Sequence, residues 1–406
     1  MDAELVARLR AEMDYEEART APPEGFPRFP DLPAGRYIDP AFFELERASI
    51  WSRSWMLAVH ADELPEVGSF VLWEDAGAPV LIVRGQDRKV RAFYNTCRHR
   101  GAPVVRERSG QVSRLRCQYH SWTYDLEGRL VAVPDACDFV DLDRSCRALV
   151  ALRCESWGPW VFVNQDPGAA PLLESLASIP EEMREFEPQS LRLVDKHGFD
   201  LACNWKVAIE AFLEVYHLKH IHPRSVNQLL DHRRSAMGLL RGGHSRMVTA
   251  KRPERVGEAE VPQGLPDIPG VGTLARITNV AYFAFPNLVT PLDSTGFPFL
   301  LFWPRDIRRT RMEVLWFGPC WEGDELPAFW KQFIPIFDVV LREDTENLAW
   351  IQTSLDSAGF RGVPLGYQER RIYHFHEQVD RAIGPERIPE VLRVESCVGP
   401  YVERPR

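Results

Sequence analysis

The sequence lacks a long hydrophobic run, because no stretch approaches the roughly 20 apolar residues that a membrane-spanning helix needs. The first ten residues, MDAELVARLR, carry early acidic residues and no apolar centre, so we expect no signal peptide. Positive charge is not in excess either: 49 Lys and Arg against 58 Asp and Glu give a net charge of −9. This balance argues against a nucleic-acid-binding surface and favours soluble small-molecule chemistry. No flavin or dinucleotide-binding fingerprint is present.

Regular cysteine spacing is missing outside one short region. Of the eight cysteines, we expect six to be reduced and packed rather than bridged. These six are Cys137, Cys146, Cys154, Cys203, Cys320 and Cys397. Reduced thiols favour a cytoplasmic location. A chain of 406 residues suggests two domains, and its 45% hydrophobic and 26% charged residues are those of an ordinary globular protein.

The remaining two cysteines belong to a split motif of mixed metal ligands. Cys97 and His99 form one half, Cys117 and His120 form the other, and the spacing is C-x-H-x17-C-x2-H. Two facing loops of this kind can bind two irons asymmetrically, with both thiolates on one iron and both imidazoles on the other. That is the ligation of a Rieske [2Fe–2S] centre, whose reduction potential lies at roughly −150 to +300 mV.

Structural zinc is the alternative for these four residues, since zinc also accepts two sulfurs and two nitrogens. Zinc fingers and ribbons usually pair two cysteines in one knuckle, whereas each half of this motif is mixed. The flanking residues are rich in turns and aromatics, as a cluster shielded from water requires. The pattern therefore favours iron and sulfide over zinc.

The segments Cys-Arg-His-Arg-Gly and Cys-Gln-Tyr-His-Ser-Trp resemble those of the Rieske non-haem iron oxygenases, in particular the large (α) subunit of the terminal oxygenase. This family includes aromatic-ring-hydroxylating dioxygenases and quaternary-amine monooxygenases. One position departs from the pattern: the family usually has glycine after the second histidine, and this chain has Ser121. A serine can take the same turn at a small conformational cost.

Three histidines, His217, His220 and His222, follow a predicted helix that begins after Asn204. Non-haem Fe(II) that activates O2 typically binds two histidines and one carboxylate on one face. Helical periodicity favours His217 with His220, but Pro223 disfavours helical geometry at His222. The residues alone leave the choice of the pair open.

The resemblance implies a choice. The family pattern of a carboxylate, two residues, His, four residues and His falls on Glu214, His217 and His222, which leaves His220 as the alternative ligand.

The resemblance places the third ligand to a mononuclear iron in an acidic helix before a glutamine, and here Asp344 precedes Gln352 in this way. Glu343 is the alternative. Without the histidines, an acid in this run would be interpreted as solvated charge on an amphipathic helix.

Glu214 has a separate implied role. In the family, a carboxylate at this position links an iron histidine of one subunit to a cluster histidine of the next, here His217 to His120. Most members have Asp, and Glu resembles the subset that acts on carnitine and betaine. The alternative is an ordinary helix acid.

The resemblance implies an α+β fold in which an antiparallel β Rieske domain is inserted in a helix-grip (START-like) catalytic domain. That catalytic domain has a curved antiparallel sheet and long helices. We predict an N-terminal arm and helix over residues 1–44 that pack with the catalytic domain, a Rieske domain over 45–165 and the mononuclear iron domain over 166–406.

Local patterns predict the individual elements. Expected strands cover residues 69–73, 80–84, 90–94, 160–164, 279–285, 297–303 and 312–317. Expected helices cover residues 40–55, 172–186, 205–217, 326–358 and 370–383. We expect a loop over the substrate entrance at residues 251–275.

The implied function is that of a terminal oxygenase, which uses O2 to hydroxylate a small organic substrate by aromatic-ring dihydroxylation or monooxygenation. Electrons would come from NAD(P)H through a separate reductase or ferredoxin. The resemblance implies a homotrimer, with or without a small β subunit, and no nucleic-acid or membrane partner. The alternatives are a monooxygenase or demethylase of a quaternary ammonium compound such as carnitine or betaine, a Rieske electron carrier without oxygenase activity, and a zinc-bound structural or regulatory protein.

Overall fold

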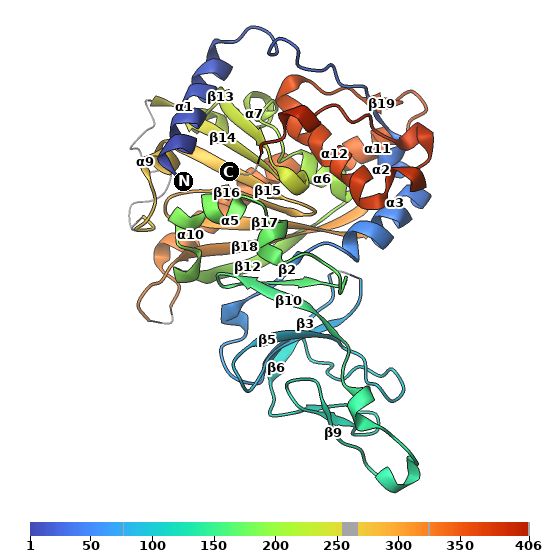
Figure 1. Cartoon of the computed structure of the whole chain (residues 1–406). Coiled ribbons are helices and arrows are strands. Elements are labelled where there is room, and N and C mark those ends of the chain that lie inside the picture. The colour runs from blue at the N-terminus through green and yellow to red at the C-terminus, as the bar shows by residue number, and fades with distance from the viewer. Residues whose placement is uncertain (76, 254–266, 324, 405–406) are drawn as a thin grey trace. The chain divides into compact units, whose positions relative to one another are not determined.

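The computed structural model describes residues 1–75, 77–253, 267–323 and 325–404. Contacts divide the chain into two compact units. One unit combines Met1–Ile50 with Leu176–Arg406, and the other is Trp51–Ser175. The second unit therefore interrupts the first in sequence (Figure 1).

The unit Trp51–Ser175 is built on antiparallel strands. A seven-stranded sheet has the order β2-β11-β10-β5-β4-β3-β6, and a small three-stranded sheet has the order β7-β8-β9. Their bounds are β2 Met56–His60, β3 Ser69–Trp73, β4 Val80–Arg84, β5 Val90–Tyr94, β6 Ser109–Gln111, β7 Leu115–Arg116, β8 Thr123–Tyr124, β9 Leu130–Ala132, β10 Ala151–Trp157 and β11 Trp160–Asn164. The core of this unit includes Cys97 and Cys117, so the loops that carry these two residues pack their cysteine side chains into it.

The other unit contains a second seven-stranded antiparallel sheet, in the order β12-β18-β17-β16-β15-β14-β13. Its strands are β12 Leu191–Leu201, β13 Leu230–Leu239, β14 Ser245–Lys251, β15 Thr278–Ala284, β16 Leu288–Leu292, β17 Phe297–Asp306 and β18 Arg309–Pro319. Register shifts interrupt the β12–β18, β13–β14 and β17–β18 pairs. Such bulges bend strands and increase their twist, which curves the sheet.

Helix α12 (Arg370–Ile383) lies against this sheet (Figure 1). Arg371 Nε donates to Ser245 Oγ at 2.9 Å, His374 Nε2 contacts the Leu240 carbonyl oxygen at 2.8 Å, and Phe375 packs edge-on against Phe283. A curved antiparallel sheet around a helix is the predicted helix-grip form, and the predicted fold class is confirmed.

The same unit also contains a helix near the N-terminus and a helix that carries Asp344. Within the predicted N-terminal arm and helix, α1 covers Ala3–Ala18, and the Asp2 side chain caps its first turn by accepting a hydrogen bond from Leu5 N. Helix α10 (Ala328–Thr345) crosses beside the sheet and carries Asp344. None of the helices described for the chain is long and apolar enough to cross a bilayer.

Some helices are shorter than the sequence predicted. The expected helix over 172–186 is divided into α4 (Leu172–Ser175), α5 (Ile179–Glu182) and a 3₁₀ turn at Arg184–Phe186. The break coincides with the boundary between the two units after Ser175.

The expected helix over 205–217 ends early, since α6 is Trp205–Glu210. The chain turns through the backbone bonds of Phe212 N to the Ile209 oxygen and of Leu213 N to the Glu210 oxygen. Further on, the Glu214 carboxylate accepts hydrogen bonds from the backbone N–H groups of Tyr216 and His217. Side-chain bonds of this kind compete with helical ones. Helix α7 follows at Leu218–Ile221.

The expected helix over 326–358 is two helices, α10 and α11 (Leu348–Leu355), separated at Glu346 and Asn347. Asparagine bonds readily to nearby backbone outside helices, which favours a break. The expected helix over 40–55 is α3 (Pro40–Glu46) followed by a π-helical turn at Arg47–Trp51.

The predicted loop over 251–275 lies largely outside the described residues, which omit 254–266. In the described part, β14 extends to Lys251 and a short helix, α9, covers Thr273–Ile277.

Candidate metal centres and the pocket

The two loops that carry the mixed motif are each closed by backbone hydrogen bonds in the same pattern. Cys97 N donates to the carbonyl oxygen five residues later, that of Ala102, and Cys117 N donates to that of Trp122. The fourth residue after each cysteine, Gly101 or Ser121, donates back to the cysteine carbonyl oxygen at 3.0 and 2.9 Å. Both of these residues have positive φ, 74° for Gly101 and 58° for Ser121. Ser121 thus occupies the position where glycine stands in the other loop.

The four side chains of the motif come together at these loops. The Cys97 and Cys117 thiols are buried, and Cys117 contributes to raising the pKa of Cys97. The His99 and His120 ring centroids lie 4.7 Å apart, and the Trp122 ring stacks on His99 at 4.8 Å. Burial lowers the pKa of His99, with a further contribution from His120. A neutral imidazole is the form that binds a metal.

Tyr124 lies directly against one of the thiols. Its hydroxyl is 3.3 Å from Cys97 Sγ and accepts a hydrogen bond from Arg98 N at 2.9 Å. Burial raises the pKa of Cys97, whereas the bond to Tyr124 opposes that rise. The hydroxyl is therefore placed to donate to a thiolate at this position.

These residues fit a [2Fe–2S] cluster of the Rieske type. The donors are two buried sulfurs and two imidazoles, as that ligation requires. Within the described part of the chain, the buried His99 Nδ1 has no hydrogen-bond partner. A buried ring nitrogen usually has a partner, so this atom is available to a metal.

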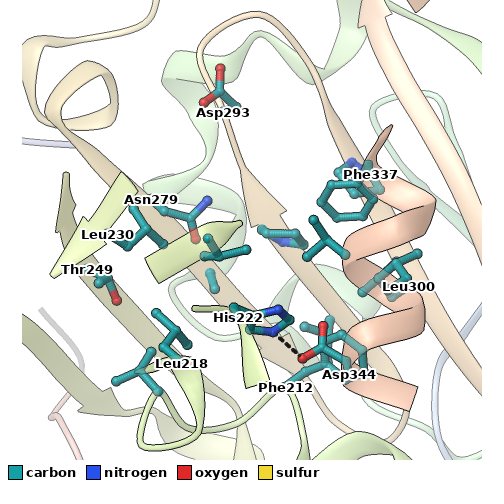
Figure 2. Close-up of a pocket in the computed structure, with 18 of the residues that line it drawn as sticks. Phe212, Leu218, His222, Leu230, Thr249, Asn279, Asp293, Leu300, Phe337 and Asp344 are labelled. Atoms are coloured by element: carbon teal, nitrogen blue, oxygen red, sulfur yellow. Dashed lines mark hydrogen bonds and ion pairs between the residues drawn. The ribbon is translucent and has the colours of Figure 1, made fainter. Parts of the chain in front are cut away.

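A second group of ligands is formed by His217, His222 and Asp344. One donor atom from each residue lies within 4.8 Å of the others. Asp344 Oδ1 lies 3.3 Å from His217 Nε2. It also lies 2.7 Å from His222 Nε2, the contact drawn as a dashed line in Figure 2. The histidines stand at the two ends of α7, and Asp344 comes from the last turn of α10. Two imidazoles and one carboxylate suit a mononuclear Fe(II) with open positions.

Each of these histidines has a second carboxylate on its other ring nitrogen. Glu214 Oε1 hydrogen-bonds His217 Nδ1, and Glu343 Oε2 contacts His222 Nδ1 at 2.7 Å. Carboxylates in this position fix the tautomer and orientation of a metal-binding imidazole. Burial opposes a charge on His217, but Asp344 and Glu214 together raise its pKa to about 10.

Two alternatives from the sequence take other places in the structure. His220 is exposed and does not line the pocket. Glu343 contacts the outer nitrogen of His222 rather than the ligand group. Sequence reasoning missed this contact of Glu343, and only its position next to Asp344 could have indicated it.

The candidate iron ligands lie at one end of a cavity of about 230 Å³. Its walls come from the sheet and from α10, and most of the lining side chains are apolar. The lining also holds four aromatic residues, Phe212, Trp316, Phe333 and Phe337. No Lys or Arg is found among the described residues that line it. A largely apolar cavity excludes water from chemistry at the metal.

Comparison with protein families assigns both halves of this architecture. Residues 54–142 match the Rieske [2Fe–2S] domain, and residues 183–384 match the catalytic domain of the ring-hydroxylating α subunit. The first range contains the cysteine and histidine loops, and the second contains the three-residue group.

The chain belongs to the Rieske non-haem iron oxygenases. The cofactors that go with these two domains are a Rieske [2Fe–2S] cluster and a mononuclear iron.

Among curated proteins, this Rieske oxygenase is 31% identical to the carnitine monooxygenase oxygenase subunit of Escherichia coli K12 over 194 residues, or 47% of this chain and 52% of that protein. It is 30% identical to the glycine betaine monooxygenase oxygenase subunit of Pseudomonas aeruginosa UCBPP-PA14 over 200 residues, or 49% of this chain and 46% of that protein. The chain thus spans about half the length of these relatives. Spinach chloroplastic choline monooxygenase is 27% identical over 356 residues, covering 85% of this chain and 76% of that protein.

Solved structures share the fold. The quaternary ammonium Rieske monooxygenase CntA in complex with L-carnitine aligns with a TM-score of 0.72 at 23% identity, covering 90% of this chain and 99% of CntA. Naphthalene 1,2-dioxygenase from Rhodococcus sp. aligns with a TM-score of 0.71 at 20% identity, covering 94% and 98%.

Proposed function

We propose that this Rieske oxygenase is a terminal oxygenase component that hydroxylates a small organic substrate. O2 and electrons from NAD(P)H, delivered by a partner reductase or ferredoxin, drive the reaction. The observation that carries this proposal is the group His217, His222 and Asp344 at the end of an apolar cavity. An electron carrier needs only the cluster loops, so this second site argues against that function.

We propose Cys97, His99, Cys117 and His120 as ligands of the cluster, and His217, His222 and Asp344 as ligands of the mononuclear iron. When bound, the cluster supplies single electrons and the iron activates O2. The protein residues position and protect these centres. Glu214 and Glu343 hold the imidazoles in place through their outer nitrogens. The apolar walls hold the substrate and exclude water.

Glu214 is our candidate for the carboxylate between subunits. It would link His217 to His120 of the next chain in a head-to-tail homotrimer. Its contact with His217 Nδ1 supports this role, and inter-subunit electron transfer is described for a related quaternary ammonium Rieske monooxygenase. Glu214→Gln should retain both metals but slow reoxidation of the reduced cluster. Glu346→Gln, at an exposed position, is the matched control; reoxidation of both variants at the wild-type rate would refute the role.

The second candidate is monooxygenation or demethylation of a quaternary ammonium compound. Three related proteins carry the names of carnitine, glycine betaine and choline monooxygenases, and Glu at position 214 agrees with that subset. Aromatic side chains in the pocket can also attract a cation.

A single-turnover experiment tests the proposed function. The reduced holoenzyme is mixed with O2 and one of naphthalene, choline, carnitine or glycine betaine, and products are measured by mass spectrometry with labelled O2. Labelled oxygen in an organic product is the expected result. Cluster reoxidation without any labelled product from these or wider substrates would favour the electron carrier.

A further inference from the structure

The polar side chains that line the cavity fall into two groups. One group surrounds the candidate iron site, and the other contains Thr249, Asn279 and Asp293. Figure 2 shows these three residues away from Asp344, with apolar side chains between. The second group is not used by the chemistry proposed above.

Strand register explains why these three residues lie together. Thr249 of β14 pairs directly with Asn279 of β15. Leu292 of β16 pairs with Val280, so the following residue, Asp293, comes beside Asn279. Paired residues on neighbouring strands share a face of the sheet. The three side chains therefore form one row across the pocket floor, which we call the polar row.

The adjacent row on the same face is apolar. It consists of Met247, Ala281 and Pro291, which also pair across β14, β15 and β16 and also line the cavity. Residues two apart on a strand are separated by roughly 6.5 Å. A substrate that spans from the iron end to the polar row must therefore place an apolar body over this intermediate row.

The hydrogen bonds of the polar row determine what it can recognise. Asp293 Oδ1 accepts from Thr295 N at 3.3 Å and Thr295 Oγ1 at 3.2 Å, and its Oδ2 accepts from Lys251 Nζ at 3.2 Å. These contacts fix the carboxylate but leave its side chain 23% exposed. A carboxylate oxygen can accept more than one bond, so Asp293 retains the capacity to accept from a ligand.

Asn279 adds a second acceptor. Its Nδ2 is 3.4 Å from the Leu292 carbonyl oxygen, and no described residue donates to its Oδ1. Lys251, which forms an ion pair with Asp293, has a side chain that is 11% exposed and does not line the cavity. Thr249 Oγ1 lies 2.9 Å from Ser235 Oγ, and either hydroxyl can donate in that bond. The ligand thus meets one carboxylate, one neutral amide and one hydroxyl at this end, and no cation from the described lining.

We propose that the polar row is the specificity-determining end of the pocket, and that it accepts a substrate whose distal group donates hydrogen bonds, such as an ammonium, amide or hydroxyl group. It disfavours a carboxylate at this place, because a carboxylate would meet Asp293 without a cation in the lining. This inference rests on the proposed function and specifies the substrate class of the same site.

Two matched pairs of probes test the inference by calorimetric titration of the anaerobic, reduced holoenzyme. Choline carries a hydroxymethyl group where glycine betaine carries a carboxylate. Likewise, 3-phenylpropylamine carries an ammonium group where 4-phenylbutyrate carries a carboxylate, on the same apolar body. We expect the donor member of each pair to bind about tenfold or more tightly than its carboxylate partner.

Variants of Asp293 separate this effect from general packing. Asp293→Asn should reduce the preference for 3-phenylpropylamine by about tenfold, and Asp293→Lys should invert it in favour of 4-phenylbutyrate. Asp306→Asn is the matched control, since Asp306 is also ion-paired near a strand end of this sheet but does not line the cavity. The spectrum of the reduced cluster checks that each variant is folded.

The proposal would be overturned if the carboxylate probes bound as tightly as their donor partners. It would also be overturned if Asp293→Lys left the preference for 3-phenylpropylamine over 4-phenylbutyrate unchanged, or if none of the four probes bound. Recruitment of Lys251 by the carboxylate would be the physical reason for the first result. Binding is measured without O2 and without turnover. Absence of hydroxylation would therefore count against the proposed function alone.

Discussion

At the scale of single residues, the candidate iron site consists of paired imidazoles and carboxylates. Asp344 contacts the inner nitrogens of His217 and His222, while Glu214 and Glu343 contact the outer ones. Removing an inner carboxylate removes a ligand, whereas removing an outer one only loosens the ring it orients. Variants can therefore distinguish these two functions.

Asp344→Ala should abolish mononuclear iron binding and turnover but leave the cluster spectrum intact. Glu343→Gln should weaken iron affinity by about 10- to 100-fold and retain activity when Fe(II) is in excess. Iron content and turnover against added Fe(II) measure both effects. Loss of the cluster in Asp344→Ala would contradict two independent metal sites, and wild-type affinity in Glu343→Gln would contradict its positioning role.

Protons compete with iron at His217. Its pKa is raised to about 10 in the metal-free protein, above the ordinary value near 6.5, so the ring is protonated at pH 7. Iron must displace this proton. Fe(II) affinity should therefore rise with pH from 6.5 to 9, with release of about one proton per iron, measured by calorimetry in buffers of different ionisation enthalpy. Affinity independent of pH would contradict this protonation state.

Tyr124 should raise the reduction potential of the cluster. Its hydroxyl can donate to the Cys97 sulfur, and such a bond stabilises the more negative, reduced state. A bond worth about 1 kcal/mol corresponds to roughly 40 mV for one electron. Tyr124→Phe should lower the potential by about this amount in a redox titration. Tyr94→Phe, whose hydroxyl bonds Gln165, should leave it unchanged, and an unchanged potential in Tyr124→Phe would refute the assignment.

At the scale of elements, local sequence predicted the metal loops better than the helices. The ligands of the cluster lie within short turns, so their spacing alone indicates their geometry. Helix ends depend on tertiary contacts. Glu214 holds the turn before α7, and the role of Glu343 arises only when α10 meets His222. No periodicity in the sequence reports such contacts, although the His217, His222 and Asp344 set could be identified from the family pattern.

The equivalence of the two cluster loops yields a prediction for Ser121. A residue other than glycine at φ 58° costs roughly 1 kcal/mol, while the Arg116 bond to Ser121 Oγ is exposed and contributes little. Ser121→Gly should therefore stabilise the Rieske unit by about 0.5–1 kcal/mol. Denaturant-induced loss of cluster absorbance measures this.

Ser113→Gly is the control, since Ser113 is exposed and does not have positive φ. It should have no effect or a small destabilising one. A Ser121→Gly protein that loses its cluster more easily than the wild type would show that the hydroxyl, rather than the turn, matters at this position.

At the scale of the whole molecule, the proposed trimer makes each site depend on two chains. A Cys117→Ser chain lacks a cluster but keeps its iron site, and an Asp344→Ala chain has the reverse defect. In a head-to-tail ring, the cluster of one chain serves the iron of its neighbour. When equal amounts of the two variants are mixed and reassembled, half of the chains have an intact iron site and half of their neighbours have an intact cluster. Roughly a quarter of wild-type activity should therefore be recovered. Transfer within one chain predicts no recovery.

The central claim is that one chain holds a Rieske cluster and a separate mononuclear iron. Electron paramagnetic resonance of the dithionite-reduced protein, with iron and acid-labile sulfide counts on the same sample, tests it most directly. We expect a rhombic signal of Rieske type and about three irons to two sulfides per chain. Zinc in place of iron, with no signal from the reduced protein, would contradict it.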